Sequence, residues 1–249
     1  MTKAKVALVT GSAKGIGAAI IRELASKGYD CVINYNTSAS DAKKLRDEIN
    51  KLGVKCLAIK CDVSDEKEVD TMFNIIEKEL GGVDILINNA AVDLSDLFAN
   101  KSVEIFRKTI DVNLIGAYIV AKRAYKHMID NKWGRIINIS STNGINSYYP
   151  VCLEYDASKA ALNSLTHNLA IEFAPYVTVN AIAPGFIGTE NELNGYDEEF
   201  LKEELEKILV KRYGNPEEVA HLVKFLVSDE ASYINNSIIR IDGGQYGAN

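Results

Sequence analysis

Short apolar runs alternate with longer helical patterns along the chain. The runs are rich in valine and isoleucine and show no alternation between apolar and polar positions. Bare apolar runs are typical of parallel strands, because helices cover both faces of a parallel sheet. The predicted strands are Val6–Thr10, Cys31–Tyr35, Leu57–Cys61, Ile85–Asn88, Arg135–Ser140, Val177–Ala183 and Ser237–Asp242.

Helical patterns separate these strands, and an order of strand, helix and strand predicts a parallel sheet. The predicted helices are Ala18–Lys27, Asp41–Leu52, Glu66–Glu79, a long helical region over Val103–Asp130, Tyr155–Phe173, Phe200–Val210 and Pro216–Val227. No repeat, low-complexity tract or linker rich in proline and glycine interrupts this order. We therefore expect a single α/β domain over residues 1–249, with a Rossmann-type, doubly wound parallel sheet in three layers.

The composition excludes several classes of function. Of the 249 residues, 47% are apolar and 25% are charged, as in an ordinary globular protein, and the formal net charge is −6. This charge gives no basic surface for nucleic acid, and no stretch approaches the roughly 18 apolar residues of a membrane span. The N-terminus leads directly into the first strand without a signal-peptide pattern, so we expect a cytoplasmic protein.

The cysteines and histidines are not spaced as metal ligands. The four cysteines lack a Cys-x-x-Cys pair, and three lie in or beside apolar strands, so we expect reduced, structural thiols. Cys152 comes three residues before Tyr155 and is expected at most to line a pocket. His127, His167 and His221 lie on separate helical patterns, and we predict no metal site.

A glycine-rich turn follows the first strand. The segment Thr10-Gly11-Ser12-Ala13-Lys14-Gly15-Ile16-Gly17 opens directly into a helix. Gly11 permits a tight turn, Gly15 lets the backbone approach a pyrophosphate and Gly17 allows close packing, while the helix N-terminus offers free N–H groups. Because the turn joins a strand to a helix, we predict dinucleotide binding, although the spacing Gly-x-x-x-Gly-x-Gly differs from the commonest fingerprint.

Tyr155 and Lys159 are four residues apart in a predicted helix, so they share one face with Cβ atoms about 5–6 Å apart. An unperturbed tyrosine has a pKa of about 10, and a fixed ammonium beside it favours the phenolate. The pair is therefore a candidate proton donor for acid–base catalysis. Taken alone, the pair is better explained as a half-buried ring beside a solvated amine, because this spacing arises by chance in many helices.

The glycine spacing, the Tyr155/Lys159 pair and several further motifs make the chain resemble the short-chain dehydrogenase/reductases, from Lys5 to Asp242-Gly243-Gly244. The further motifs are Asp62-Val63 after the third strand, Asn88-Asn89-Ala90-Ala91 at the end of the fourth, Asn113 in the long helix, Ile139-Ser140-Ser141 at the end of the fifth and Pro184-Gly185-Phe186-Ile187-Gly188-Thr189 at the end of the sixth. Ala91 departs from the family, which has glycine there. The order of the motifs matches the family.

The resemblance implies hydride transfer to a carbonyl carbon. Tyr155 would protonate the carbonyl oxygen, and Lys159 would bind the nicotinamide ribose and favour the tyrosinate. Ser141 would donate a hydrogen bond to the substrate oxygen. Asn113 would position a water that relays protons toward Lys159.

Ser141 has two neighbouring hydroxyl residues, Ser140 and Thr142, that are rivals for its role. A hydroxyl at this place also suits a purely local task, which is to satisfy a backbone group at the end of the strand. Ser141 is the candidate because its offset from the apolar strand matches the pattern of the family that the chain resembles.

NADPH is the expected cofactor rather than NADH. NAD-specific relatives place an acidic residue at the end of the second strand, whereas here the segment reads Asn34-Tyr35-Asn36-Thr37-Ser38, and Lys14 lies where a cation could reach a 2′-phosphate. A solvated loop amine is the other interpretation of Lys14. The resemblance implies that Asp62-Val63 contacts adenine and that Ile187 and Thr189 contact the nicotinamide carboxamide. The expected cofactor-binding residues are Gly11, Ser12, Lys14, Gly15, Ile16, Gly17, Tyr35, Asn36, Asp62, Val63, Asn89, Ala90, Tyr155, Lys159, Pro184, Gly185, Ile187 and Thr189.

Among subfamilies, the chain most resembles the 3-oxoacyl-acyl-carrier-protein reductases, which implies a 3-oxoacyl thioester substrate, fatty acid synthesis and acyl carrier protein as a candidate partner. Those reductases have basic residues near the mouth of the site, and Lys132 and Arg135 remain here. The expected lid, Glu190–Glu206, carries eight carboxylates against the single Lys202 and would repel an acidic carrier protein. An ordinary solvated helix face is the other interpretation of these carboxylates.

Two alternatives to this substrate prediction stay open. One is an enzyme of the same family that acts on a free ketone, a sugar or a polyol. The other is a nucleotide-binding regulator that kept the fold and lost the chemistry, which the intact Ser141, Tyr155 and Lys159 argue against. The family is usually tetrameric, so the resemblance also implies a homotetramer that pairs the long helices and the last strand.

Overall fold

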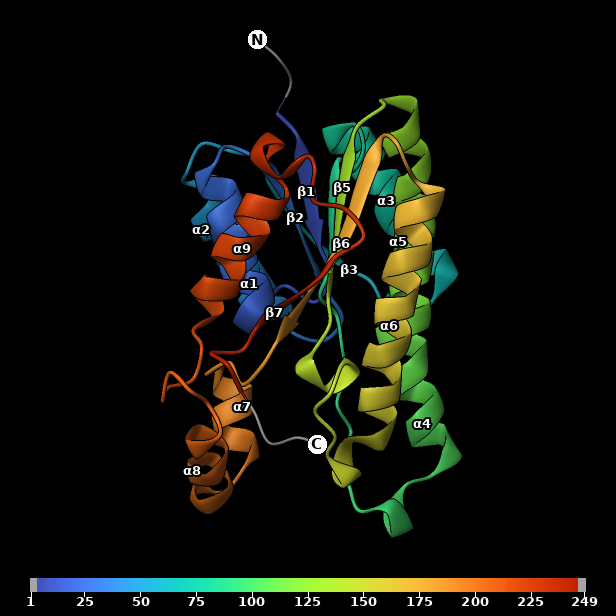
Figure 1. The fold of residues 1–249 in the computed structure, drawn as a ribbon. Coiled ribbons are helices and arrows are strands. Elements are labelled where there is room, and N and C mark those ends of the chain that lie inside the picture. Colours follow the sequence, from blue (N-terminus) through green and yellow to red (C-terminus); the bar gives the residue numbers. More distant parts are fainter. Residues whose placement is uncertain (1–3, 246–249) are drawn as a thin grey trace.

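Seven parallel strands form one sheet in the middle of the molecule (Figure 1). The computed structural model describes residues 4–245, and its strands are β1 (Val6–Val9), β2 (Asp30–Tyr35), β3 (Cys56–Lys60), β4 (Ile85–Asn88), β5 (Gly134–Ile139), β6 (Val177–Pro184) and β7 (Ile238–Ile241). They lie in the order β3-β2-β1-β4-β5-β6-β7, and all neighbouring pairs are parallel. All seven predicted strands are present, with ends that differ by at most one residue.

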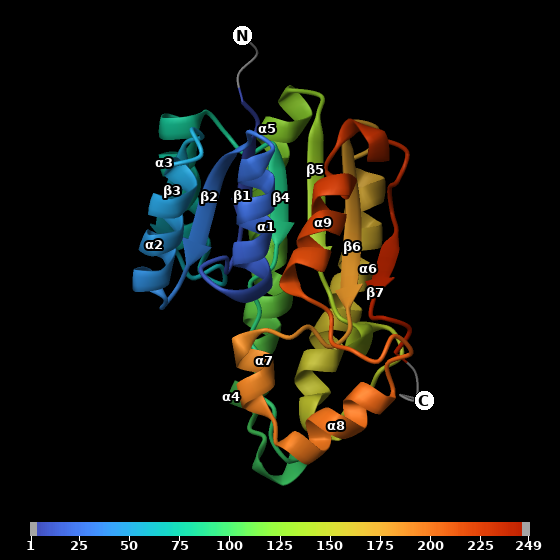
Figure 2. The same cartoon turned by 90° about the vertical axis from the view of Figure 1, so that its left-hand side faces the viewer.

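Helices cover both faces of the sheet (Figure 1). One face carries α1 (Gly15–Ser26), α2 (Ala39–Asn50) and α9 (Pro216–Leu226), and the other carries α3 (Glu66–Leu80), α5 (Ala117–Asp130) and α6 (Leu153–Glu172). Figure 2 shows α7 (Glu190–Gly195) and α8 (Glu198–Glu206) below the carboxyl ends of the strands. The predicted Rossmann-type, three-layer α/β fold is confirmed.

The two helical layers explain why the strands lack an alternating pattern. All four residues of β1 and all eight of β6 are buried, because each strand packs against helices on both sides. Each fully buried valine or isoleucine contributes about 1.5–3 kcal/mol relative to leaving it exposed. The apolar runs are therefore the hydrophobic core itself, and they fix the sheet on which the site is built.

The strand order reverses between β1 and β4. The chain leaves β1 toward β2 and β3, and it leaves β4 toward β5, β6 and β7 on the other side. In open parallel sheets, ligands bind in the crevice beyond the carboxyl ends of the strands at such a reversal. The glycine-rich turn after β1 and the segment Asn88-Asn89 at the end of β4 meet at this place.

The long helical region predicted over Val103–Asp130 contains a π-helical turn. This turn, Asp111–Gly116, separates α4 (Val103–Ile110) from α5. A π-helical turn is rare and often lies at a functional site. It contains Asn113, whose side chain is buried.

All four cysteines are buried with free thiols, and their burial fits the prediction that they are structural residues. Cys31 and Cys56 are partners on β2 and β3, and burial raises the pKa of the Cys56 thiol to about 12. Within residues 4–245, no helix has both the length and the apolar character that a bilayer crossing requires.

Candidate active site

A cavity of about 540 Å³ opens beyond the carboxyl ends of β4, β5 and β6. Segments that follow these strands form its walls together with the start of α6 and residues of α7 and α8. Among the predicted site residues, the lining includes Ile16, Asn89, Ser141, Tyr155, Lys159, Pro184, Gly185, Ile187 and Thr189. The fold therefore brings the candidate proton donor and hydroxyl donor together with the candidate nicotinamide contacts.

Tyr155 and Lys159 lie one turn apart on α6, with the Lys159 Nζ 5.3 Å from the centre of the Tyr155 ring. The Lys159 Nζ also donates a 2.8 Å hydrogen bond to the carbonyl oxygen of Ile139 at the end of β5. Burial lowers the pKa of Lys159 to about 8, and the carboxylate of Asp93 opposes this shift. A buried ammonium is thus held beside the phenol, where it favours the phenolate.

Ser141 precedes a short 3-10 turn, Thr142–Gly144, that leads away from β5. Its Oγ accepts a 3.1 Å hydrogen bond from the backbone N–H of Asn143 and donates one of 3.3 Å to the Asn143 Oδ1. Ser140 and Thr142 also line the cavity, but the Ser140 Oγ donates a 3.4 Å hydrogen bond to the Lys159 carbonyl oxygen. The contact of Ser140 with helix backbone favours Ser141 over Ser140 as the substrate hydroxyl donor.

Asn113 contacts α6 through Ser158 and is not among the described residues that line the cavity. Its Oδ1 accepts a 2.8 Å hydrogen bond from the Val92 N–H, and its Nδ2 donates to the Val92 carbonyl oxygen and to the Ser158 Oγ at 2.9 and 3.0 Å. The Ser158 Oγ in turn donates to the Tyr155 carbonyl oxygen at 2.7 Å. Asn113 therefore connects the loop after β4 to the turn of α6 that carries Tyr155.

The glycine-rich turn has the shape that a dinucleotide phosphate requires. Gly11 has a φ of 60°, and a Cβ added to it would lie 2.8 Å from the Ala90 Cα. A Cβ on Gly17 would lie 2.7 Å from both the Asn89 Nδ2 and the Ser12 Cα. The Asn89 Nδ2 braces this turn by donating to the carbonyl oxygens of Thr10 and Gly11 at 2.9 and 3.1 Å. The turn leaves no room for a side chain at Gly11 or Gly17, so its close backbone packing fits a dinucleotide cofactor.

The predicted adenosine contacts lie at the ends of β2 and β3. The Asn36 Nδ2 donates to the Asp62 Oδ2 at 3.1 Å, and the Lys108 Nζ is 3.6 Å from the same oxygen. Lys14 precedes the first residue of α1, and its Nζ is 3.2 Å from the Asp41 Oδ2 in the first turn of α2. The cation predicted to meet a 2′-phosphate therefore already has a carboxylate partner.

The basic residues Lys132 and Arg135 are not at the mouth of the cavity within this chain. Arg135 is the second residue of β5, so it lies at the amino end of the sheet, roughly 15–20 Å along the strand from the site. It is buried, with its guanidinium 4.5 Å from the Trp133 ring centre and 3.6 Å from Asp229. The prediction that these two residues meet a carrier protein at the mouth was wrong for a single chain, because strand polarity places them at the opposite end.

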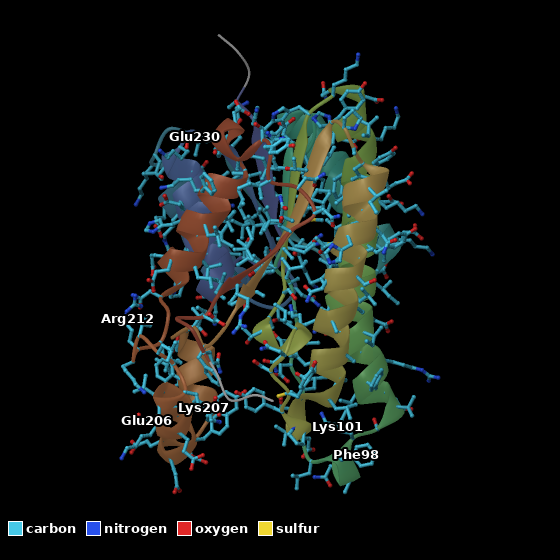
Figure 3. The ribbon with its side chains drawn as sticks, viewed as in Figure 1. Phe98, Lys101, Glu206, Lys207, Arg212 and Glu230 are labelled. Carbon is cyan, nitrogen blue, oxygen red and sulfur yellow. The ribbon has the colours of Figure 1, made fainter. Side chains whose placement is uncertain are left out.

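Two contacts beside the cavity were not predicted from the sequence. At the start of α6, Lys101 pairs with Glu154, the residue directly before Tyr155. The lining residue Tyr149 donates a hydrogen bond to Glu204 of α8. Figure 3 labels Lys101 near the start of α6 and Lys207 at the end of α8, at the same end of the molecule. No periodic pattern marks such pairs, because the partners are 53 and 55 residues apart.

Comparison with known proteins identifies the family. A family model described as "Enoyl-(Acyl carrier protein) reductase" matches residues 11–245. A solved structure of a Serratia marcescens short-chain dehydrogenase/reductase, a double mutant, superposes with a TM-score of 0.91 at 33% identity, covering 97% of this chain and 98% of that one. The chain belongs to the short-chain dehydrogenase/reductase family.

Relatives in this family carry different activities in their names. The chain is 41% identical to a 3-oxoacyl-[acyl-carrier-protein] reductase FabG of Aquifex aeolicus, with 97% of each protein covered. It is 37% identical to 3beta-hydroxysteroid dehydrogenase 1 of Eggerthella lenta and 36% identical to glucose 1-dehydrogenase 2 of Bacillus subtilis, with 97% and 96% of this chain and 94% of each relative covered. Family membership makes this short-chain dehydrogenase/reductase an NAD(P)-dependent oxidoreductase. Because the relatives have different substrates in their names, the substrate of this chain has to be inferred from its site.

Proposed function

We propose that this short-chain dehydrogenase/reductase reduces a carbonyl group to a secondary alcohol with NADPH. The observation that carries the proposal is the buried Lys159 ammonium, held 5.3 Å from the centre of the Tyr155 ring inside the cavity. A regulator that only binds nucleotide could use Lys159 at the nicotinamide ribose, but it has no need of a phenol beside that lysine. Desolvating that ammonium is costly, and the cost is consistent with a catalytic role.

The residues of the cavity divide the chemistry between them. A bound nicotinamide cofactor would supply the hydride for the carbonyl carbon. The Tyr155 hydroxyl gives its proton to the carbonyl oxygen as negative charge develops there, and the Ser141 hydroxyl donates a hydrogen bond to the same oxygen. The Lys159 ammonium stabilises the tyrosinate left behind until a proton returns.

A 3-oxoacyl thioester is our first candidate substrate, because the FabG relatives of 36–41% identity carry that activity in their names. A free ketone, sugar or polyol is the second candidate, and a specific observation favours it. The exposed Asp197 at the N-cap of α8 lines the cavity, and the carboxylates of α8 other than Glu204 are exposed, while Arg135 is buried at the far end of the sheet. A single chain therefore offers an acidic carrier protein more repulsion than attraction.

A panel of carbonyl compounds separates these candidates. We expect NADPH oxidation with acetoacetyl-CoA at a kcat/KM at least tenfold above that with free ketones, sugars and polyols of similar size. Linking the acetoacetyl group to acyl carrier protein should raise kcat/KM further if the carrier docks. Activity with free ketones and none with the thioester would remove the first candidate, and no activity with any carbonyl would favour the regulator.

Lys14 and Asp41 provide a test of the cofactor preference. We expect Lys14→Ala to raise the Kd for NADPH by about tenfold and to leave NADH binding unchanged, because a charge-assisted contact to a phosphate is lost. Asp41→Asn should tighten NADPH binding severalfold, since a 2′-phosphate would no longer compete with the carboxylate. Titration of cofactor fluorescence measures both constants.

Asp47→Asn is the control for Asp41→Asn. Asp47 lies on the same helix and carries the same charge, but its ion-pair partner is Arg46 rather than Lys14. If Asp47→Asn tightens NADPH binding as much as Asp41→Asn, the effect comes from net charge alone. Equal effects of Lys14→Ala on both cofactors would contradict a role for Lys14 at the 2′-phosphate.

A homotetramer is the assembly that we infer. Large apolar side chains are exposed along α4, the π-helical turn and α5, including Val103, Phe106, Ile115 and Tyr118. The strand β7 forms one edge of the sheet and is only partly buried. Pairing these two surfaces with other copies would remove them from water, as the usual assembly of the family does.

A further inference from the structure

The lid helix α8 contains a carboxylate that is almost completely buried. Glu204 is 1% exposed, although the other acidic side chains of this helix face solvent. Its Oε2 accepts a 2.7 Å hydrogen bond from the Tyr149 hydroxyl, and its Oε1 lies 2.6 Å from the Lys207 Nζ. The Gln245 Nε2 also donates to the Glu204 Oε2, at 3.5 Å. An ionised carboxylate is stable in such a place only while its partners remain. Lys207 belongs to the end of the same helix, so the contacts that hold α8 against the rest of the molecule are those of Glu204 with Tyr149 and Gln245.

Tyr149 has contacts at both of its ends. Its hydroxyl binds the lid through Glu204, whereas its backbone N–H donates a 3.2 Å hydrogen bond to the Asp156 Oδ2 on α6. Its ring lines the cavity and lies 6.3 Å from the ring of Phe200, which belongs to α8 and also lines the cavity. Burial and the neighbouring carboxylate raise the pKa of the Tyr149 phenol, so this hydroxyl remains a donor at physiological pH.

Asp156 extends this connection to the reacting groups. It directly follows Tyr155, and its Oδ1 accepts a 2.7 Å hydrogen bond from the Asn143 Nδ2. The Asn143 backbone N–H in turn donates to the Ser141 Oγ. Hydrogen bonds therefore run without interruption from the lid to the segments that hold the two catalytic hydroxyls.

We propose that Tyr149 is a positioning residue that ties the lid helix α8 to the start of α6, so that a carbonyl substrate is bound under a seated lid and aligned with Tyr155. The proposal rests on the proposed function. A substrate that loses this alignment by even a small displacement reacts much more slowly, because proton and hydride transfer both require close approach. Loss of the Tyr149 hydroxyl should therefore weaken substrate binding and slow turnover while the cofactor still binds.

Tyr149→Phe tests this role, with Tyr148→Phe as a matched control. Tyr148 is exposed, and among the described residues its hydroxyl donates only to the Ile145 carbonyl oxygen. We expect Tyr149→Phe to raise the KM for acetoacetyl-CoA by about tenfold and to lower kcat severalfold, with the Kd for NADPH within twofold of wild type. Tyr148→Phe should match wild type in all three constants.

A double variant tests whether the hydrogen bond to Glu204 carries the effect. Because Tyr149→Phe and Glu204→Ala remove the same interaction, the double variant should be about as impaired as the worse single variant. Effects that multiply would overturn the proposal, and so would a Tyr149→Phe variant that behaves like Tyr148→Phe.

Limited digestion with trypsin gives a measure of the lid that needs no turnover. Lys202 is the exposed lysine of α8, and we expect cleavage after it to be about tenfold faster in Tyr149→Phe than in wild type or Tyr148→Phe. Unchanged cleavage would overturn the proposal even if the enzyme reduces ketones. Faster cleavage in an enzyme that reduces no carbonyl would uphold the lid contact and reject the proposed function.

Discussion

Tyr155→Phe is expected to lower kcat by about 10²–10⁴-fold, the range that a positioned proton donor contributes. The phenylalanine ring keeps the shape of the side chain and removes the proton that the carbonyl oxygen must receive. NADPH should bind as tightly as to wild type, because the glycine-rich turn and Lys159 are unchanged. Steady-state turnover with the best carbonyl of the panel and a fluorescence titration with NADPH measure the two constants.

Tyr233→Phe is a suitable control for this substitution. Tyr233 is fully exposed and is not among the described residues that line the cavity, so loss of its hydroxyl should leave kcat unchanged. A Tyr155→Phe enzyme that retains more than a tenth of wild-type kcat would refute Tyr155 as the acid. Equal losses of NADPH binding and turnover would instead assign Tyr155 a binding role.

Local signals account for the parts of the structure that the sequence predicted well. A strand buried on both faces must be apolar throughout, so Val6–Val9 and the other strands can be recognised from their own residues alone. The glycine-rich turn is equally local, since Gly11 and Gly17 meet backbone or side chains within 3 Å of where a Cβ would lie. The fold and the place of the glycine-rich turn follow from such short stretches.

Contacts between distant segments account for what could not be predicted. The π-helical turn around Asn113 depends on Val92 and Ser158, which bind its amide from two other segments. The prediction for Arg135 was wrong for a related reason. Its positive charge suggested contact with an acidic carrier protein, whereas its place at the amino end of β5 buries it against Trp133. Residue type and spacing indicate chemistry, but strand direction decides which end of the sheet a side chain reaches.

The burial of Glu204 could not be predicted from the sequence either, because it also depends on a contact between distant segments. Glu204 belongs to a run of acidic residues that fits a solvated helix face, and nothing in that run separates it from Glu203 or Glu206. Its burial comes from the position of α8 over Tyr149. The carboxylates of α8 therefore comprise exposed ones that can repel an anionic partner and the buried Glu204, which accepts a hydrogen bond from Tyr149.

Lys101→Met is expected to lower the free energy of unfolding by about 3–5 kcal/mol, the usual cost of leaving one member of a buried ion pair without its partner. The Lys101 Nζ lies 2.5 Å from the Glu154 carboxylate, and these side chains are 7% and 0% exposed. Methionine fills a similar volume, so the loss is mainly electrostatic. Urea denaturation followed by circular dichroism measures the change.

Two further variants distinguish this burial effect from loss of a lysine in general. Lys122→Met removes a lysine whose pair with Glu66 is exposed, with 3.5 Å between the charged atoms, and it should cost less than about 1 kcal/mol. The double variant Lys101→Met/Glu154→Leu should recover most of the stability, because no unpaired charge stays buried. If Lys101→Met lowers the free energy of unfolding no more than Lys122→Met does, the Lys101–Glu154 pair does not stabilise the start of α6.

Because Glu154 directly precedes Tyr155, we also expect Lys101→Met to lower kcat through displacement of the first turn of α6.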